Sequence, residues 1–162
     1  MRLKENRRFI VSCFYLGYLP FAPGTWGSLF GLIFSLYIHI SWVWFFVLFA
    51  LSWYLICLYD DEMDPGWIVV DEYLGIMLYL LLIERNVYTV VLGFVFFRLF
   101  DIWKPFPISW VDQKLLPSLK TRALAVIVDD LIAGVMAYGV VMVLTLLFKF
   151  PIYTIQTIFL VF

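Results

Sequence analysis

The sequence predicts an all-α fold, a polytopic membrane helical bundle with short or re-entrant helices near the N-terminus. The chain is 65% hydrophobic and only 14% charged, whereas soluble domains are about half apolar and about a quarter charged. Its mean hydropathy is +0.99. The apolar residues form long runs bounded by proline, glycine or charged residues, as expected for helices that enter or cross a bilayer. With 162 residues, the chain is expected to be a single domain over 1–162.

The N-terminal third is expected to contain a basic head, a turn-rich loop and two short helices. Prolines and glycines make residues 17–27 a loop, and Thr25 or Ser28 could cap the helix that follows. The next apolar run is too long for one straight membrane span and too short for two. We therefore expect helices at 28–39 and 42–59, forming a hairpin that enters and leaves the bilayer on the same side.

Three further apolar runs predict three more helices. An acidic loop at 60–66 precedes them. A basic stretch at 104–122 is expected to lie at the membrane surface, because its prolines cannot continue a regular helix. A short apolar tail at 152–162 ends the chain. The three helices are expected at residues 68–84, 87–103 and 124–148.

The distribution of basic residues predicts which side of the membrane each segment faces. Basic residues in short loops favour the cytoplasmic side, so we place the basic head and the 104–122 stretch there. Under this arrangement the charged residues of three helices lie at a similar depth, near the cytoplasmic helix ends. These residues are Asp71, Glu72, Arg98, Asp101, Asp129 and Asp130.

This concentration of acids predicts a metal site. A charge inside the hydrocarbon costs at least ~2.5–3.5 kcal/mol on insertion scales, and the carboxylates repel one another unless cations lie among them. Arg98 and Lys104 supply only two positive charges, so a divalent ion fits the deficit, and oxygen ligands favour Mg²⁺. The alternative is a structural ion-pair network in which Arg98 pairs with Asp101. Adjacent acids on a helix point about 100° apart, so one acid of each neighbouring pair could bind metal while the other pairs with a cation.

Other residues limit the kinds of catalysis and of partner that the sequence allows. Backbone N–H groups around Gly24, Thr25 and Gly27, at the start of a helix, could hold a phosphate. The lone histidine, His39, rules out catalysis that needs several histidines. Neither Cys13 nor Cys57 is followed six residues later by arginine, which argues against a thiolate phosphatase loop. The balanced charge argues against a nucleic-acid partner. Water activated by a metal, with carboxylates as ligands and base, remains.

Four stretches resemble the motifs of the bacterial phosphatidylglycerophosphatase A family, membrane-bound Mg²⁺-dependent lipid phosphatases. They occur in family order and spread over residues 17 to 137. The resemblance implies hydrolysis of phosphatidylglycerophosphate to phosphatidylglycerol and phosphate, by a multi-pass protein of the bacterial inner membrane with its site near the cytoplasmic face. The stretches are "GYLPFAPGTWGSL" (17–29), "DPGWIVVDEYLG" (64–75), "FRLFDIWKPFPISWVD" (97–112) and "VDDLIAGVMA" (128–137).

The resemblance also assigns expected roles to residues. Pro23, Asp64 and Pro105 fall on motif positions. Five acids are expected to be catalytic and to bind Mg²⁺, furnishing its ligands and a base for water: Asp71, Glu72, Asp101, Asp129 and Asp130. Four residues are expected to bind the substrate phosphate: Gly24, Thr25, Arg98 and Lys104.

Two readings from other classes compete with a phosphatase. An ion-coupled transporter or channel subunit could use the buried acids as a relay, although the outer halves of helices 68–84 and 124–148 are almost wholly apolar. A structural assembly factor could use the charges only to pair helices. Release of phosphate from phosphatidylglycerophosphate, with and without Mg²⁺, would distinguish the three.

Overall fold

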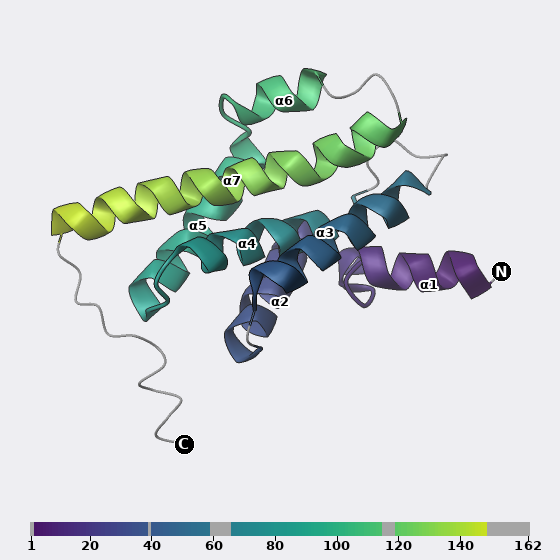
Figure 1. The fold of residues 1–162 in the computed structure, drawn as a ribbon, viewed down its shortest axis with the longest axis horizontal. Helices are drawn as coiled ribbons and strands as arrows, with labels where there is room; N and C mark the ends of the chain where they lie inside the picture. The colour runs from purple at the N-terminus through teal and green to yellow at the C-terminus, as the bar shows by residue number, and fades with distance from the viewer. Residues whose placement is uncertain (1, 39, 59–65, 115–118, 149–162) are drawn as a thin grey trace.

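The computed structural model describes residues 2–38, 40–58, 66–114 and 119–148 (Figure 1). His39, Asp64, the acidic loop at 60–64 and the tail at 152–162 lie outside this part of the chain. Every regular element within it is a helix, which confirms the all-α prediction. The elements are α1 (Arg2–Val11), the 3₁₀-helix η1 (Leu16–Tyr18), α2 (Pro23–Tyr37), α3 (Trp42–Cys57), α4 (Val70–Leu82), α5 (Val87–Trp103), α6 (Ile108–Lys114) and α7 (Leu119–Phe148).

Helix α4 is the centre of the fold. It packs against α2, α3, α5 and α7, and most of its side chains are buried. Helix α7 runs along the length of the molecule beside α4 and α5, with α6 on its outer side (Figure 1). The core therefore lies around α4, where Leu74 and Ile76 are fully buried.

Helix α2 begins earlier than predicted, so the loop expected at 17–27 is wrong in its second half. The helix starts at Pro23, because proline fixes a helical φ and loses no hydrogen bond in the first helical turn. Its cap residue is Ala22, with φ 54°, and no side chain caps it. The expected caps are therefore also wrong: the N–H of Thr25 donates to the Ala22 carbonyl, and Ser28 lies one turn inside the helix.

The helix predicted at 87–103 matches α5 at both ends. Asn86 and Thr89 form a capping box in which each side chain accepts the other residue's N–H, both at 3.0 Å. At the other end, Lys104 takes a left-handed conformation with φ 42° and ends the helix before Pro105. Helix α4 is shorter than the predicted 68–84, and the 104–122 stretch contains the short helix α6.

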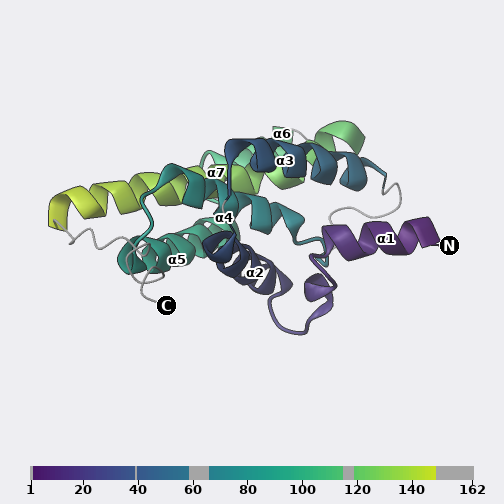
Figure 2. The same ribbon diagram turned by 60° about the horizontal axis from the view of Figure 1, so that its bottom comes forward.

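Helices α2 and α3 are the two short N-terminal helices that the sequence predicts. Ile38, which ends α2, and Ser41, which precedes α3, are both extended, and the Ser41 hydroxyl caps α3 by accepting the N–H of Trp44. Each helix packs on α4. In Figure 2 they are spread apart on either side of the α4 ribbon.

The helix lengths bear on the membrane arrangement. Within the described residues, one helical segment, Ala123–Phe148, is long and apolar enough to cross a bilayer. Helix α3 is apolar but has 16 residues, and α2, α4 and α5 have 15, 13 and 17, whereas a span usually needs about 20. The structure therefore supports the short-helix part of the prediction, and the multi-pass arrangement stays a prediction.

Candidate metal and phosphate site

A close contact between α4 and α7 brings their acidic residues together. A Cβ atom built on Gly134 would lie 2.5 Å from the carbonyl oxygen of Gly75, and one on Gly75 would lie 2.7 Å from the carbonyl oxygen of Asp130. Only glycine allows the two backbones to approach so closely. Asp71 and Asp130 each lie four residues before one of these glycines, on the same helix face. The two carboxylates therefore emerge one turn from the contact, on its N-terminal side in both helices.

Three carboxylates form a compact group. Asp71 and Glu72 from α4 and Asp130 from α7 each offer an oxygen, and these oxygens all lie within 4.8 Å of one another. Asp71 and Asp130 are 6% and 3% exposed. Among the described residues, Oε2 of Glu72 is buried without a hydrogen-bond partner. Two buried carboxylates and one half-buried carboxylate, with an unsatisfied oxygen among them, suit a hard divalent cation such as Mg²⁺, so the donor set fits the predicted ion.

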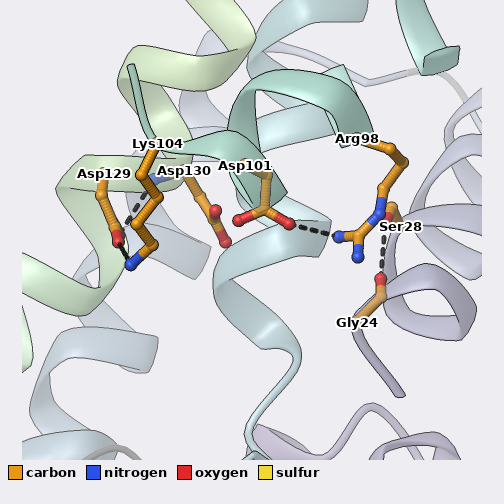
Figure 3. Close-up of polar contacts among 7 residues, drawn as sticks. All are labelled: Gly24, Ser28, Arg98, Asp101, Lys104, Asp129 and Asp130. Carbon is orange, nitrogen blue, oxygen red and sulfur yellow. Dashed lines mark hydrogen bonds and ion pairs between the residues drawn. The ribbon is translucent and has the colours of Figure 1, made fainter. Parts of the chain in front are cut away.

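Asp101 lies beside this group and forms the ion pair with Arg98. Its Oδ2 accepts a hydrogen bond from Nη1 of Arg98 at 2.5 Å. On its other side, its carboxylate lies next to that of Asp130. Figure 3 shows the Asp101 carboxylate between Asp130 and the Arg98 guanidinium. The ion pair that the sequence offered as the alternative to a metal site is therefore present together with the acidic group.

Asp129 points away from the three-carboxylate group and pairs with Lys104. Nζ of Lys104 donates to Oδ2 of Asp129 at 2.5 Å, and Oδ1 of Asp129 accepts the N–H of Asp130 (Figure 3). The two neighbouring acids therefore diverge, one toward the carboxylate group and one toward a cation. In this arrangement Lys104 and Asp129 occupy one end of the row of charges, and Arg98 occupies the other.

The start of α2 approaches the Arg98 end of that row. A Cβ on Gly24 would collide with Oε1 of Glu72 and would lie 3.2 Å from Nη1 of Arg98. The Ser28 hydroxyl, which the sequence suggested only as a cap, donates to the Gly24 carbonyl at 2.5 Å. The first N–H groups of a helix have no carbonyl partner four residues earlier. The helix end at Gly24 therefore adds positive potential next to Arg98, whereas the Thr25 N–H already donates to Ala22.

Gly27, the third backbone group suggested for phosphate, serves packing. A Cβ on Gly27 would lie 2.6 Å from Cβ of Val69. Through this close contact, α2 packs against Val69, the residue that precedes α4. The contact helps to place Gly24 beside Glu72, but it does not bring Gly27 into the row of charges.

The described cysteines do not suggest nucleophilic catalysis. Burial, together with the nearby Asp71 and Glu72 carboxylates, raises the pKa of the Cys13 thiol well above its ordinary value. A protonated, buried thiol is a poor nucleophile. This agrees with the sequence argument against thiolate chemistry.

Comparison with known proteins identifies the family. The phosphatidylglycerophosphatase A family matches residues 9–145. The chain belongs to the phosphatidylglycerophosphatase A family. Membership confirms the family resemblance and the expectation of a phosphatase, and it gives no support to the transporter reading. No solved structure matches the chain.

Individual relatives agree with this assignment. Phosphatidylglycerophosphatase A of Escherichia coli is 33% identical over 149 residues, which are 86% of this chain and 84% of the relative. The protein of the same name from Haemophilus influenzae is 36% identical over 130 residues, with coverage of 74% and 77%. A Bacteroides thetaiotaomicron protein provisionally named as a phosphatidylinositol-3-phosphatase is 30% identical over 144 residues, with coverage of 75% and 82%. All three names describe removal of phosphate from a phospholipid headgroup.

Proposed function

We propose that the protein is a Mg²⁺-dependent lipid phosphatase that hydrolyses phosphatidylglycerophosphate to phosphatidylglycerol and phosphate. Family membership and the names of two relatives support the substrate. The observation that carries the proposal is the compact group of Asp71, Glu72 and Asp130. Together with Asp101 and Asp129, these acids outnumber Arg98 and Lys104 by three, so an anionic phosphate needs further positive charge to approach them.

The first role in the proposed mechanism is metal binding. Asp71, Glu72 and Asp130 would hold Mg²⁺, and the bound ion would supply Lewis-acid activation of the phosphate ester. Burial helps these residues, because electrostatic interactions are stronger where water is excluded. Asp129 stands outside this group and is proposed to orient Lys104 rather than to bind the ion.

The second role is phosphate binding and proton transfer. Arg98 and the α2 start at Gly24 would bind the phosphate from one side, and Lys104 would face it from the other, offsetting the charge that develops during reaction. Asp101 lies between Asp130 and Arg98 and pairs with Arg98, so it is placed to take a proton from the attacking water. Thr25 would contribute only through its position in the first turn of α2.

We further propose that the whole chain acts as one integral domain of the bacterial inner membrane. The apolar segment Ala123–Phe148 supports attachment to a bilayer. The basic N-terminal head and the basic 104–122 stretch support a site at the cytoplasmic face. The shorter helices would then accompany α7 in the bilayer as a multi-pass bundle, with α2 and α3 as its re-entrant members. Cysteine labelling at residues 40, 62 and 85 would test this topology, and an external position 62 would refute it.

The test is phosphate release by the full-length protein in lipid nanodiscs. Phosphatidylglycerophosphate is expected to be hydrolysed with Mg²⁺ and spared in excess chelator, and Asp130→Asn is expected to lose at least ~10²-fold in rate. Phosphatidylinositol-3-phosphate serves as the comparison substrate and is expected to react more slowly. Activity that survives both chelation and Asp130→Asn would refute the metal site, and a faster comparison reaction would refute the substrate.

A further inference from the structure

A cavity next to the acidic group has a different chemical character from the site itself. It lies among the end of α1 and the helices α2, α3 and α4, and its volume is about 320 Å³. Ligand pockets typically occupy about 300–1,000 Å³. Its walls include Phe34, Leu48 and Met77, and none of the described residues that line it is charged. Such a cavity suits a hydrocarbon and does not suit a headgroup.

Helix α4 connects this cavity directly to the acids. Val70, Tyr73 and Met77 follow a helical spacing of three and four residues and all line the cavity. Asp71 follows Val70 in the chain and points about 100° away around the helix. One face of α4 thus borders the cavity, and the adjacent face carries the Asp71 carboxylate. Val70 and Asp71, the first residues of these two faces, lie in the same helical turn.

Helix α2 gives the cavity a direction. Gly24, at its start, approaches Glu72 and Arg98, whereas Phe34 lines the cavity. Ten residues of α-helix separate them, which is about 15 Å. Met77 likewise lies further along α4 than Asp71. The cavity therefore extends from the charged site in the direction in which both helices run, as a lipid tail extends from its headgroup.

The mouth of the cavity is open and apolar. Phe14 and Trp44 line it and are 57% and 58% exposed. An acyl chain could therefore enter from the side, without passing the charged residues. The cavity exists because α2 and α3 separate from each other while both pack on α4 (Figure 2).

We propose that this cavity between α2, α3 and α4 binds one acyl chain of the lipid substrate while the headgroup phosphate occupies the acidic site. The inference rests on the proposed phosphatase function and names the part of the substrate that the function leaves unassigned. A chain that leaves the bilayer for the cavity exchanges one apolar environment for another, so it gains little from the hydrophobic effect. The cavity instead orients the substrate so that its phosphate is held against Arg98 and the start of α2.

The test uses photolabelling of the full-length protein in phosphatidylcholine nanodiscs. The probe is a phosphatidylglycerophosphate analogue with a diazirine in the middle of one acyl chain, and a phosphatidylcholine with the same group is the comparison. The first probe is expected to label α2 and α3 at Phe34, Leu48 or Leu51. The second is expected to label exposed positions on α7 instead. Equal labelling of the cavity by both lipids, or none by the first, would overturn the proposal.

A filled cavity provides the second arm. Ser52 is a buried residue of the cavity wall on α3, and Ser52→Leu adds bulk there. Ala50→Leu is the matched control, because Ala50 is exposed on the same helix and does not line the cavity. We expect Ser52→Leu to lower cavity labelling by at least ~5-fold and to raise KM for long-chain substrate, while Ala50→Leu matches the unmodified protein. Equal labelling and KM in both variants would refute the inference.

The melting temperature of the variants and the release of phosphate by the unmodified protein keep the possible outcomes separate. If Ser52→Leu lowers the melting temperature, Leu48→Trp adds bulk at a different point of the same wall, and unchanged labelling in that variant would refute the inference. If the unmodified protein releases no phosphate from the lipid, the proposed function fails. If it releases phosphate but the label lies outside the cavity, only the acyl-chain site fails.

Discussion

Gly24 offers a sharp test of the site, because a methyl group there would press on two of its residues without touching the backbone. In Gly24→Ala, the new Cβ would collide with Oε1 of Glu72, and it would lie 3.0 Å from Cδ of Glu72 and 3.2 Å from Nη1 of Arg98. Carbon–carbon contacts are normally about 3.5–4.0 Å, and Oε1 of Glu72 is closer to the new Cβ than Cδ is. The Glu72 carboxylate must therefore withdraw by at least about 1 Å. A misplacement of about 1 Å at a catalytic group can cost ~10²-fold in rate. We expect Gly24→Ala to lower the rate of phosphate release by ~10- to 100-fold.

The same substitution should barely change stability. The groups that must move are the ends of flexible side chains, and alanine gains roughly 0.5–1 kcal/mol over glycine inside a helix. We expect the melting temperature of Gly24→Ala to stay within a few degrees of the unmodified protein. Gly139→Ala is the control, since its Cβ would meet nothing within 4 Å. If Gly24→Ala keeps full activity, Glu72 and Arg98 are not where the reaction needs them, and the placement of the site is wrong.

Three further outcomes are expected. Gly134→Ala should lower stability by ~1–3 kcal/mol, because the new Cβ would lie 2.5 Å from the carbonyl oxygen of Gly75, which cannot move without separating α4 from α7. A melting temperature equal to that of Gly139→Ala would contradict this. Asn86→Ala should lower the free energy of unfolding by about 1 kcal/mol, because it removes the capping oxygen of α5. The melting temperature should fall by ~2–4 °C, and unaltered thermal unfolding would show that the cap is dispensable. Chelation should abolish phosphate release and added Mg²⁺ should restore it, and failure of Mg²⁺ to restore the rate would argue for another ion.

The sequence predicted helices best where local chemistry marks their ends. The predicted ends of helix α5 agree with the structure because Asn86 caps its start and Pro105 prevents its continuation. The start of α2 was misplaced because the proline and glycines of residues 17–27 read equally as a loop and as a first helical turn. Proline is favourable at that position of a helix, and only the tertiary contact of Gly24 and Gly27 with α4 selects the helix.

The candidate site was predicted as a set of residues rather than as an arrangement. Helix geometry requires neighbouring acids to diverge, so one of Asp129 and Asp130 was expected to meet a cation. Which of the two does so depends on how α7 is rotated against α4, and that rotation is fixed by the Gly75–Gly134 contact. The sequence holds no local signal for such a rotation. The partner of Lys104 likewise follows from the left-handed turn after α5, which aims its side chain at α7.

The Gly75–Gly134 contact also bears on which ion the proposed metal site would select. Mg²⁺ is bound at about 2.0–2.1 Å with strict geometry, whereas Ca²⁺ accepts about 2.3–2.6 Å and a looser cage. Asp71 and Asp130 project from the two helices one turn from the contact, so the distance between their carboxylates is set by two backbones that touch. A larger side chain at either glycine would widen that gap and favour the larger ion. The discrimination between the two cations would then lie in residues that bind neither.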